Sequence, residues 1–134
     1  MTTAEQRTSS DGYLVSAALE AGDPARALPA LQASERDLPD DYNPPARLAA
    51  IYNALKRWDE AQAAARRSLA KAYGPRKLRV YSTMADAQAG AGDVAGARAT
   101  LDEGIAYGTA LPEEQRPKSL IAALAKKRDG LAMN

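Results

Sequence analysis

The same short pattern of residues returns along this chain every 34 to 36 positions. Small residues follow three turn signals at Ala27, Ala61 and Ala97, which lie 34 and then 36 residues apart. An apolar position upstream of each turn keeps the same step, at Val15, Ala49, Ala85 and Ile121. Such a period indicates an array of similar units, each of which buries its apolar side against the next.

Each unit has the pattern of two helices joined by a tight turn, most clearly in residues 44–75. Its first half places Leu48, Ala49, Tyr52 and Leu55 at i, i+1, i+4 and i+7, which is one face of an α-helix. The break at 56–57 is followed by a second amphipathic stretch that Gly74-Pro75 ends. A single hairpin of this size buries too little apolar surface to be stable alone.

Weaker copies of the hairpin lie on both sides. In the first copy, Gly22 suits the end of one helix, Asp23 suits the N-cap of the next, and Pro24 suits the first position of that helix. Pro29 falls inside the predicted second helix, where we expect it to remove one backbone hydrogen bond. The third copy turns at 90–93, and a last amphipathic segment follows Pro117.

The sequence therefore predicts an all-α fold, an α-solenoid of antiparallel helix hairpins with about seven helices. Residues 1–10 lack apolar periodicity and are expected to form a flexible tail. Residues 11–134 are expected to form one domain. The predicted segments of this domain are three repeats at about 11–40, 43–76 and 78–112 and a capping helix at about 117–130.

Composition excludes several kinds of chemistry. Almost half of the chain is hydrophobic, mostly alanine, which favours closely packed helices. Cysteine and histidine are absent, so disulfides, thiolate chemistry, the usual zinc ligands and the usual neutral-pH general base are excluded. No cofactor, metal site or catalytic residue is predicted.

Two short motifs have simpler explanations than catalysis. The glycine-rich stretch 90–96 resembles a dinucleotide-binding loop, but helical periodicity precedes it where that chemistry needs a strand. Ser68 and Lys71 match a Ser-x-x-Lys string, although nothing else of that catalytic constellation is present. We interpret both motifs as parts of helical hairpins.

The period and the turn residues together resemble the tetratricopeptide repeat (TPR) family. The residues that carry the resemblance in the first helices are Leu14/Val15/Ala18, Leu48/Ala49/Tyr52 and Met84/Ala85/Gln88. In the turns and second helices they are Gly22-Asp23-Pro24 with Ala27, Trp58 with Ala61, and Gly92-Asp93-Val94 with Ala97. The chain departs from the family pattern because no tryptophan opens a first helix and Gln88 replaces an aromatic residue.

The resemblance implies that the first helices line a concave groove that binds a peptide. Carried over by position, the groove residues include Tyr13, Ser16, Arg47, Asn53, Arg79, Ser82 and Asp86, with Leu19, Ala50 and Thr83 beside them. One TPR subclass clamps a C-terminal carboxylate, but only Arg79 keeps the sense of that pattern here. A chaperone-tail receptor is therefore not expected, although Arg47 and Arg79 could pair with an acidic group of a ligand.

The predicted function is a non-enzymatic protein- or peptide-binding scaffold whose partner carries an acidic segment. Charge supports an anionic partner, because residues 45–81 hold nine basic and two acidic side chains while residues 1–44 hold three and eight. The alternatives are a regulatory or self-associating assembly domain that docks through Leu120, Ile121 or Leu124, and, less favoured, a basic nucleic-acid surface.

No membrane span or signal peptide is recognised, so a soluble, cytoplasmic protein is the default expectation; a trimmed periplasmic or exported protein would give the same sequence. The partner, the pathway and the oligomeric state are not determined by the sequence.

Overall fold

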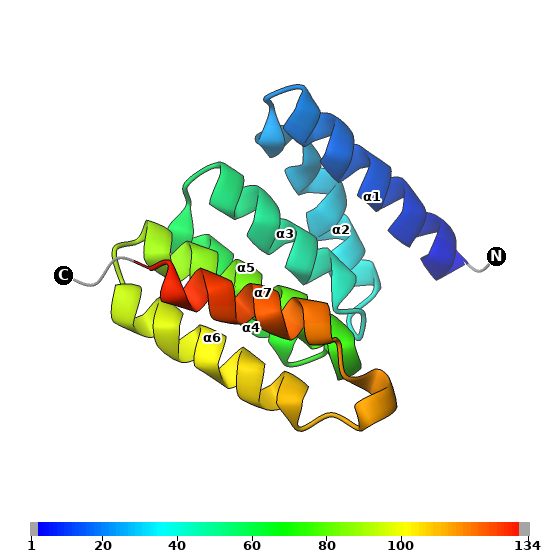
Figure 1. Cartoon of the computed structure of the whole chain (residues 1–134). Helices are drawn as coiled ribbons and strands as arrows, with labels where there is room; N and C mark the ends of the chain where they lie inside the picture. The colour runs from blue at the N-terminus through cyan, green and yellow to red at the C-terminus, as the bar shows by residue number, and fades with distance from the viewer. Residues whose placement is uncertain (1–2, 132–134) are drawn as a thin grey trace.

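A computed structural model of the chain describes residues 3–131. Over that range the chain forms seven α-helices and no strand, which confirms the predicted all-α array (Figure 1). The α-helices are α1 Thr3–Glu20, α2 Leu28–Asp37, α3 Asn43–Ala54, α4 Trp58–Leu69, α5 Lys77–Gly90, α6 Val94–Thr109 and α7 Lys118–Asp129. Three 3₁₀ turns lie between them, η1 Pro24–Ala27, η2 Gly74–Arg76 and η3 Glu113–Gln115.

The helices stack as antiparallel hairpins, most closely α3 with α4 and α5 with α6. The first helices of successive hairpins lie side by side, because α3 contacts both α1 and α5. Helix α7 packs on α5 and α6 as the first helix of a further hairpin would (Figure 1). It therefore takes the place predicted for a capping helix.

The same backbone motif closes the first helix of all three hairpins. A residue with positive φ follows the helix at Gly22 (71°), Lys56 (58°) and Gly92 (87°). The next amide then donates to a carbonyl five residues back: Asp23 to Ala18 at 2.9 Å, Arg57 to Tyr52 at 2.8 Å and Asp93 to Gln88 at 2.9 Å. This is the Schellman helix ending, in which a left-handed residue satisfies free carbonyls. Its recurrence shows that the sequence period corresponds to a repeated turn.

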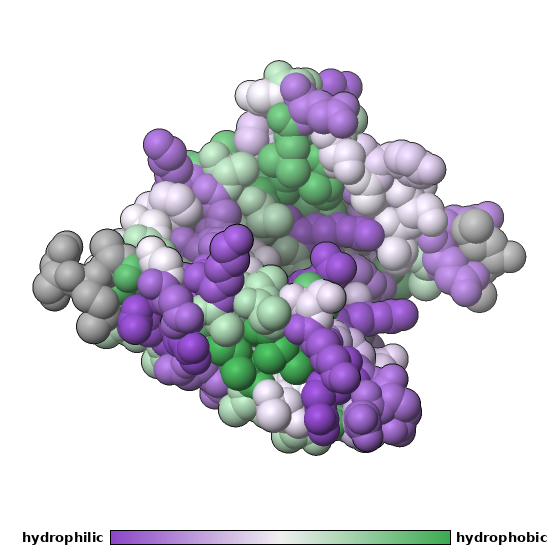
Figure 2. Space-filling view, in the orientation of Figure 1, coloured by the Kyte–Doolittle hydropathy of each residue, from purple (hydrophilic) through white to green (hydrophobic). Residues whose placement is uncertain are grey.

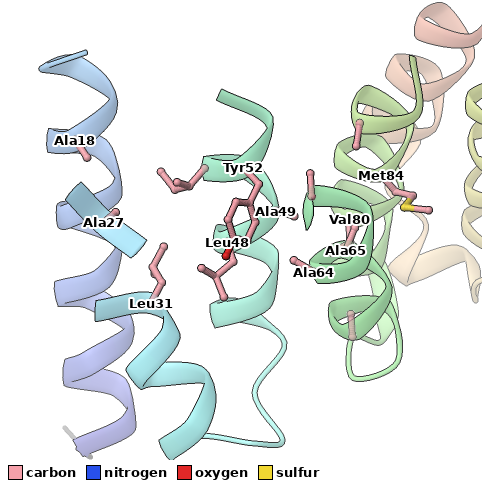
Figure 3. Packing of buried hydrophobic residues seen from close by; sticks show 14 residues of the cluster. Ala18, Ala27, Leu31, Leu48, Ala49, Tyr52, Ala64, Ala65, Val80 and Met84 are labelled. Carbon is pink, nitrogen blue, oxygen red and sulfur yellow. The ribbon is translucent and has the colours of Figure 1, made fainter. Parts of the chain in front are cut away.

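Small residues let the paired helices approach closely. The three alanines at equivalent positions of the repeat, Ala27, Ala61 and Ala97, are fully buried. Around the first two lies a group of buried side chains that includes Leu31, Leu48 and Met84 (Figure 3). A second group joins α5, α6 and α7 through Leu78, Ala85, Ala97, Leu101 and Leu124. The core is therefore a thin layer that runs along the array.

The first helix begins eight residues before its predicted start at Asp11. Residues 3–10 belong to α1, so the predicted tail is wrong for them, and residues 1–2 lie outside the described range. Polar contacts hold this part of the helix: Arg7 pairs with Asp37 at 2.7 Å, and the Thr8 carbonyl accepts from Arg47 at 2.8 Å. Helix residues attached by polar contacts leave no apolar periodicity in the sequence, and this is why the pattern did not reveal them.

The effect of Pro29 also differs from the prediction. The segment after Gly22 starts as the 3₁₀ turn η1, and the α-helix begins only at Leu28. Pro29 is therefore in the first turn of α2, where its missing N–H breaks no intrahelical hydrogen bond.

Candidate functional site

Helices α1, α3, α5 and α7 lie side by side and form one surface of the array, here called the inner face. Figure 2, in the orientation of Figure 1, shows hydrophilic side chains mixed with apolar surface over these helices. The sequence-predicted groove residues all belong to α1, α3 and α5.

A hollow lies at each seam between neighbouring helices of the inner face. The first hollow, between α1 and α3, is lined by Thr8, Ser9, Gly12, Tyr13, Ser16 and Arg47. The second, between α3 and α5, is lined by Tyr42, Asn43, Ala46, Arg76, Arg79, Val80 and Thr83. The third, between α5 and α7, is lined by Leu78, Arg79, Ser82, Thr83, Leu120, Ala123 and Leu124. Five of the seven predicted residues line these hollows; Asn53 and Asp86 do not.

Arg47, predicted to meet a ligand, is bonded to the neighbouring helix. Its Nη1 donates to the backbone oxygen of Thr8 at 2.8 Å. A Cβ added to Gly12 would lie 3.4 Å from Arg47 Nη2, so the guanidinium lies directly against α1. Arg47 therefore helps to hold α1 on α3 while it lines the first hollow.

Asn53 makes a similar contact with the next helix along the array. Its Nδ2 donates to the backbone oxygen of Thr83 at 3.1 Å, which joins α3 to α5. Its Oδ1 is buried without a hydrogen-bond partner. Since the amide faces a seam and lines none of the three hollows, its contact with α5 is structural.

Ser82 and Asp86 are engaged by a residue that sequence reasoning missed. Lys127 of α7 donates from its Nζ to Ser82 Oγ at 2.6 Å and to Asp86 Oδ1 at 2.9 Å. The sequence placed Lys127 in a basic run near the end of the capping helix, and only the packing of α7 on α5 brings it to this seam. Of the three residues in this contact, Ser82 lines the third hollow.

Three predicted residues keep their side chains free in the described part of the chain. Tyr13 is 80% exposed, and Ser16 and Arg79 are also exposed. Arg76, at the second hollow, is a fourth such residue that the sequence analysis did not single out. Within residues 3–131, neither Arg76 nor Arg79 has an ion pair or side-chain hydrogen bond. The free positive charge of the inner face is therefore concentrated at the second and third hollows.

A hollow of about 660 Å³ lies away from the inner face at the start of α6. Its polar residues Arg98 and Asp102 are both bonded to Arg128, at 3.0 and 2.9 Å. Because these groups already have partners, this hollow offers a ligand less than the seams do.

The short motifs of the sequence have structural roles. Asp93 caps α6 by accepting from the Gly96 amide at 2.9 Å, so the glycine-rich stretch is a turn. Ser68 is buried and donates to the Tyr42 carbonyl at 2.9 Å. Within residues 3–131, no three His, Cys, Asp or Glu side chains gather in a way that could hold a metal ion.

Shifted pKa values belong to packing contacts outside the three hollows. Burial raises the pKa of the Tyr81 hydroxyl, and the charge of Glu103 adds to this effect. Hydrogen bonds from the guanidinium groups to carboxylates raise the pKa of Arg67, beside Glu35, and of Arg128, beside Asp102. No helix in the described part of the chain is long and apolar enough to cross a membrane.

Comparison with known families gives an independent result. Residues 18–76 match the family described as tetratricopeptide repeat, a stretch that runs from the last residues of α1 to the end of η2. No curated protein matches the chain. Beyond residue 76, α5 and α6 repeat the same helix ending and the same buried alanine. The structure thus confirms the predicted all-α array of helix hairpins, and the family match covers its residues 18–76; repeats of this family generally serve as modules for protein–protein interaction.

Proposed function

We propose that this chain is a non-enzymatic peptide-binding module that holds an extended, acidic segment of a partner protein against its inner face. The observation that carries the proposal is the presence of a hollow at every seam, with Arg76 and Arg79 free beside two of them. An extended peptide lying across the helices meets the seams in succession. Free guanidinium groups favour carboxylates, because they present several donors in a planar fork.

The contacts on the inner face decide which variant tests this proposal. Replacing Arg47 would also break its bond to the Thr8 carbonyl and loosen α1. The Arg76→Glu/Arg79→Glu double variant changes the charge without breaking a side-chain contact. Arg26→Glu/Arg36→Glu is a matched control, because both arginines are exposed and line none of the three hollows.

The experiment selects peptides from a random displayed library against the whole chain and measures their synthetic forms by fluorescence anisotropy. We expect the selected peptides to be acidic, to bind the control variant normally, and to lose affinity for the Arg76/Arg79 variant. Circular dichroism checks that both variants keep their helices. Equal binding to the Arg76/Arg79 variant, or no selectable peptide, would contradict the proposal.

The structure favours neither of the two alternative functions. Leu124 is buried and Leu120 and Ile121 are partly buried against the core, so the apolar surface that they leave open is limited to the third hollow, which is small for a self-association interface. Of the basic residues in the middle of the chain, Arg57 pairs with Glu60 and Arg67 with Glu35. These pairs lower the free charge that a nucleic-acid backbone would need.

A further inference from the structure

We infer that the preferred ligand carries an acidic side chain and an aliphatic side chain three residues apart, held in the second and third hollows. This inference rests on the proposed function and specifies the chemistry of its ligand. The two hollows lie on opposite sides of α5 and share Arg79 and Thr83, which form the ridge between them.

The second hollow suits a carboxylate. Arg76 and Arg79 both line it, and neither meets an acidic side chain among the described residues. Its remaining polar lining is Tyr42 and Asn43, at the N-terminal end of α3, and Thr83, in the second turn of α5. A helix N-terminus adds further positive potential. With a volume of about 160 Å³, the hollow has room for a single short side chain.

The third hollow suits an aliphatic side chain. Its lining from α7 is Leu120, Ala123 and Leu124, and Leu78 of α5 lies beneath them. Besides Arg79, its polar residues are Ser82 and Thr83. The Ser82 hydroxyl already accepts from the Lys127 ammonium at 2.6 Å, and the Thr83 hydroxyl donates to the Arg79 carbonyl at 3.1 Å. A ligand group therefore meets apolar surface there together with the carbon chain of Arg79. The hollow measures about 270 Å³, larger than the second.

The distance between the seams sets the spacing of the two ligand residues. Packed helices lie roughly 8–10 Å apart, so two seams on either side of one helix are separated by a similar distance. A polyproline II segment rises about 3.1 Å per residue with three residues per turn, which puts positions i and i+3 on one side about 9 Å apart. A β-strand instead places i and i+2 on one side about 7 Å apart, which is shorter than the distance between the two seams.

Synthetic peptides test the spacing directly. The series has one Glu and one Leu in a Pro-, Ala- and Ser-based background, separated by two, three or four positions in both orders. Binding to the whole chain is measured by fluorescence anisotropy at low salt. We expect the separation of three to bind several-fold tighter than the other two in one of the orders, which also reports the direction of the peptide across α5.

Variants then assign each ligand residue to its hollow. Exchanging Leu for Ala in the best peptide should weaken binding to the wild-type chain about tenfold, but barely change binding to Leu120→Ala. Exchanging Glu for Gln should weaken binding to the wild type and barely change binding to Arg76→Gln. Circular dichroism of both variants verifies folding.

The outcomes distinguish a failure of this inference from a failure of the proposed function. Peptides that bind through Arg76 and Arg79 with no preference for spacing, or with losses that do not couple to Leu120, overturn the inference and leave the proposed function standing. If library selection gives no peptide that depends on the inner face, the proposed function fails as well.

Discussion

Lys127 on α7 reaches across the last seam of the array to Asp86 on α5, with its Nζ 2.9 Å from the carboxylate oxygen. The same ammonium donates to Ser82 at 2.6 Å. Two residues that the sequence placed in a ligand groove are thereby used to fasten the final helix. Arg47 and Asn53 do the same at the two earlier seams. Each seam of the inner face thus has a polar contact between its helices.

Removing the Lys127 contact should have a small effect on stability. The side chains of Lys127 and Asp86 are substantially exposed, so their ion pair contributes well under 1 kcal/mol to stability. The hydrogen bond from Lys127 to Ser82 adds a contribution of about the same size. We expect Lys127→Ala to lower the free energy of unfolding by about 1 kcal/mol in urea titrations. A double-mutant cycle of Lys127→Ala and Asp86→Ala should give a coupling energy below about 1 kcal/mol between the two residues, and this energy should decrease in high salt. A loss of several kcal/mol in the Lys127→Ala variant would contradict the interpretation of this contact as a weak surface interaction.

Lys56→Gly should stabilise the protein. Lys56 occupies the left-handed position that glycine fills in the other two hairpins, at φ 58°. Left-handed backbone costs a residue with a Cβ about 1 kcal/mol, and the added flexibility of glycine in the unfolded chain offsets part of this gain. We expect a net gain of about 0.5 kcal/mol in chemical denaturation. The opposite exchange, Gly92→Ala at φ 87°, should destabilise the protein by about 1 kcal/mol.

Gly90→Ala should disturb the packing of the single tryptophan. A Cβ at residue 90 would lie 2.7 Å from the Trp58 ring, so the indole must move to admit a methyl group. Overpacking of this kind costs about 1–3 kcal/mol. Because the chain has one Trp, its fluorescence reports the change directly. Gly130→Ala is the control, since its Cβ would have ordinary contact distances; identical emission and stability for both variants would refute the predicted clash.

Asp11 should contribute more to the stability of the fold than its place on the edge helix α1 suggests. Its carboxylate is buried and accepts from Ser34 Oγ at 2.6 Å, between α1 and α2. Asp11→Ala leaves the buried Ser34 hydroxyl without this partner, and we expect a loss of about 1–3 kcal/mol. Asp11→Asn keeps an acceptor and should lose less. Hydrogen exchange should rise first in α1, and unchanged α1 protection in the alanine variant would count against this anchor.

Stability should decrease in alkaline solution through Tyr81. Burial raises the pKa of its hydroxyl above the usual 10.0, so the unfolded chain releases this proton first. The stabilisation is fully present below pH 10 and is lost as the pH rises towards the folded-state pKa. Urea midpoints of the wild type should therefore drop above pH 10 more than those of Tyr81→Phe. Parallel pH profiles would argue against a buried, neutral hydroxyl.

Most of the array could be predicted from local patterns. The 34- and 36-residue steps located Ala27, Ala61 and Ala97, all of which are buried, and the turn signals located the Schellman endings. Periodicity failed at residues 3–10, because Arg7 and Thr8 join the array through polar contacts. It also could not show that η1 precedes α2, since a 3₁₀ turn and the start of an α-helix favour similar residues.

The candidate site was predictable only in outline. The residues named from family positions lie on α1, α3 and α5, but no sequence pattern indicates that Arg47, Asn53, Ser82 and Asp86 find partners on a neighbouring helix. The free cations Arg76 and Arg79 and the apolar seam beside Leu120 also depend on how α3, α5 and α7 stack.

Residue spacing alone determined the hairpins, their turns and the helices that face inward, because these follow from contacts between near neighbours along the chain. Tertiary structure decided which polar groups join helices and which have no partner among the described residues. Those contacts span 30 residues between Asn53 and Thr83 and 41 between Lys127 and Asp86. At such separations a side chain's partner is set by the angle and stagger of stacked helices.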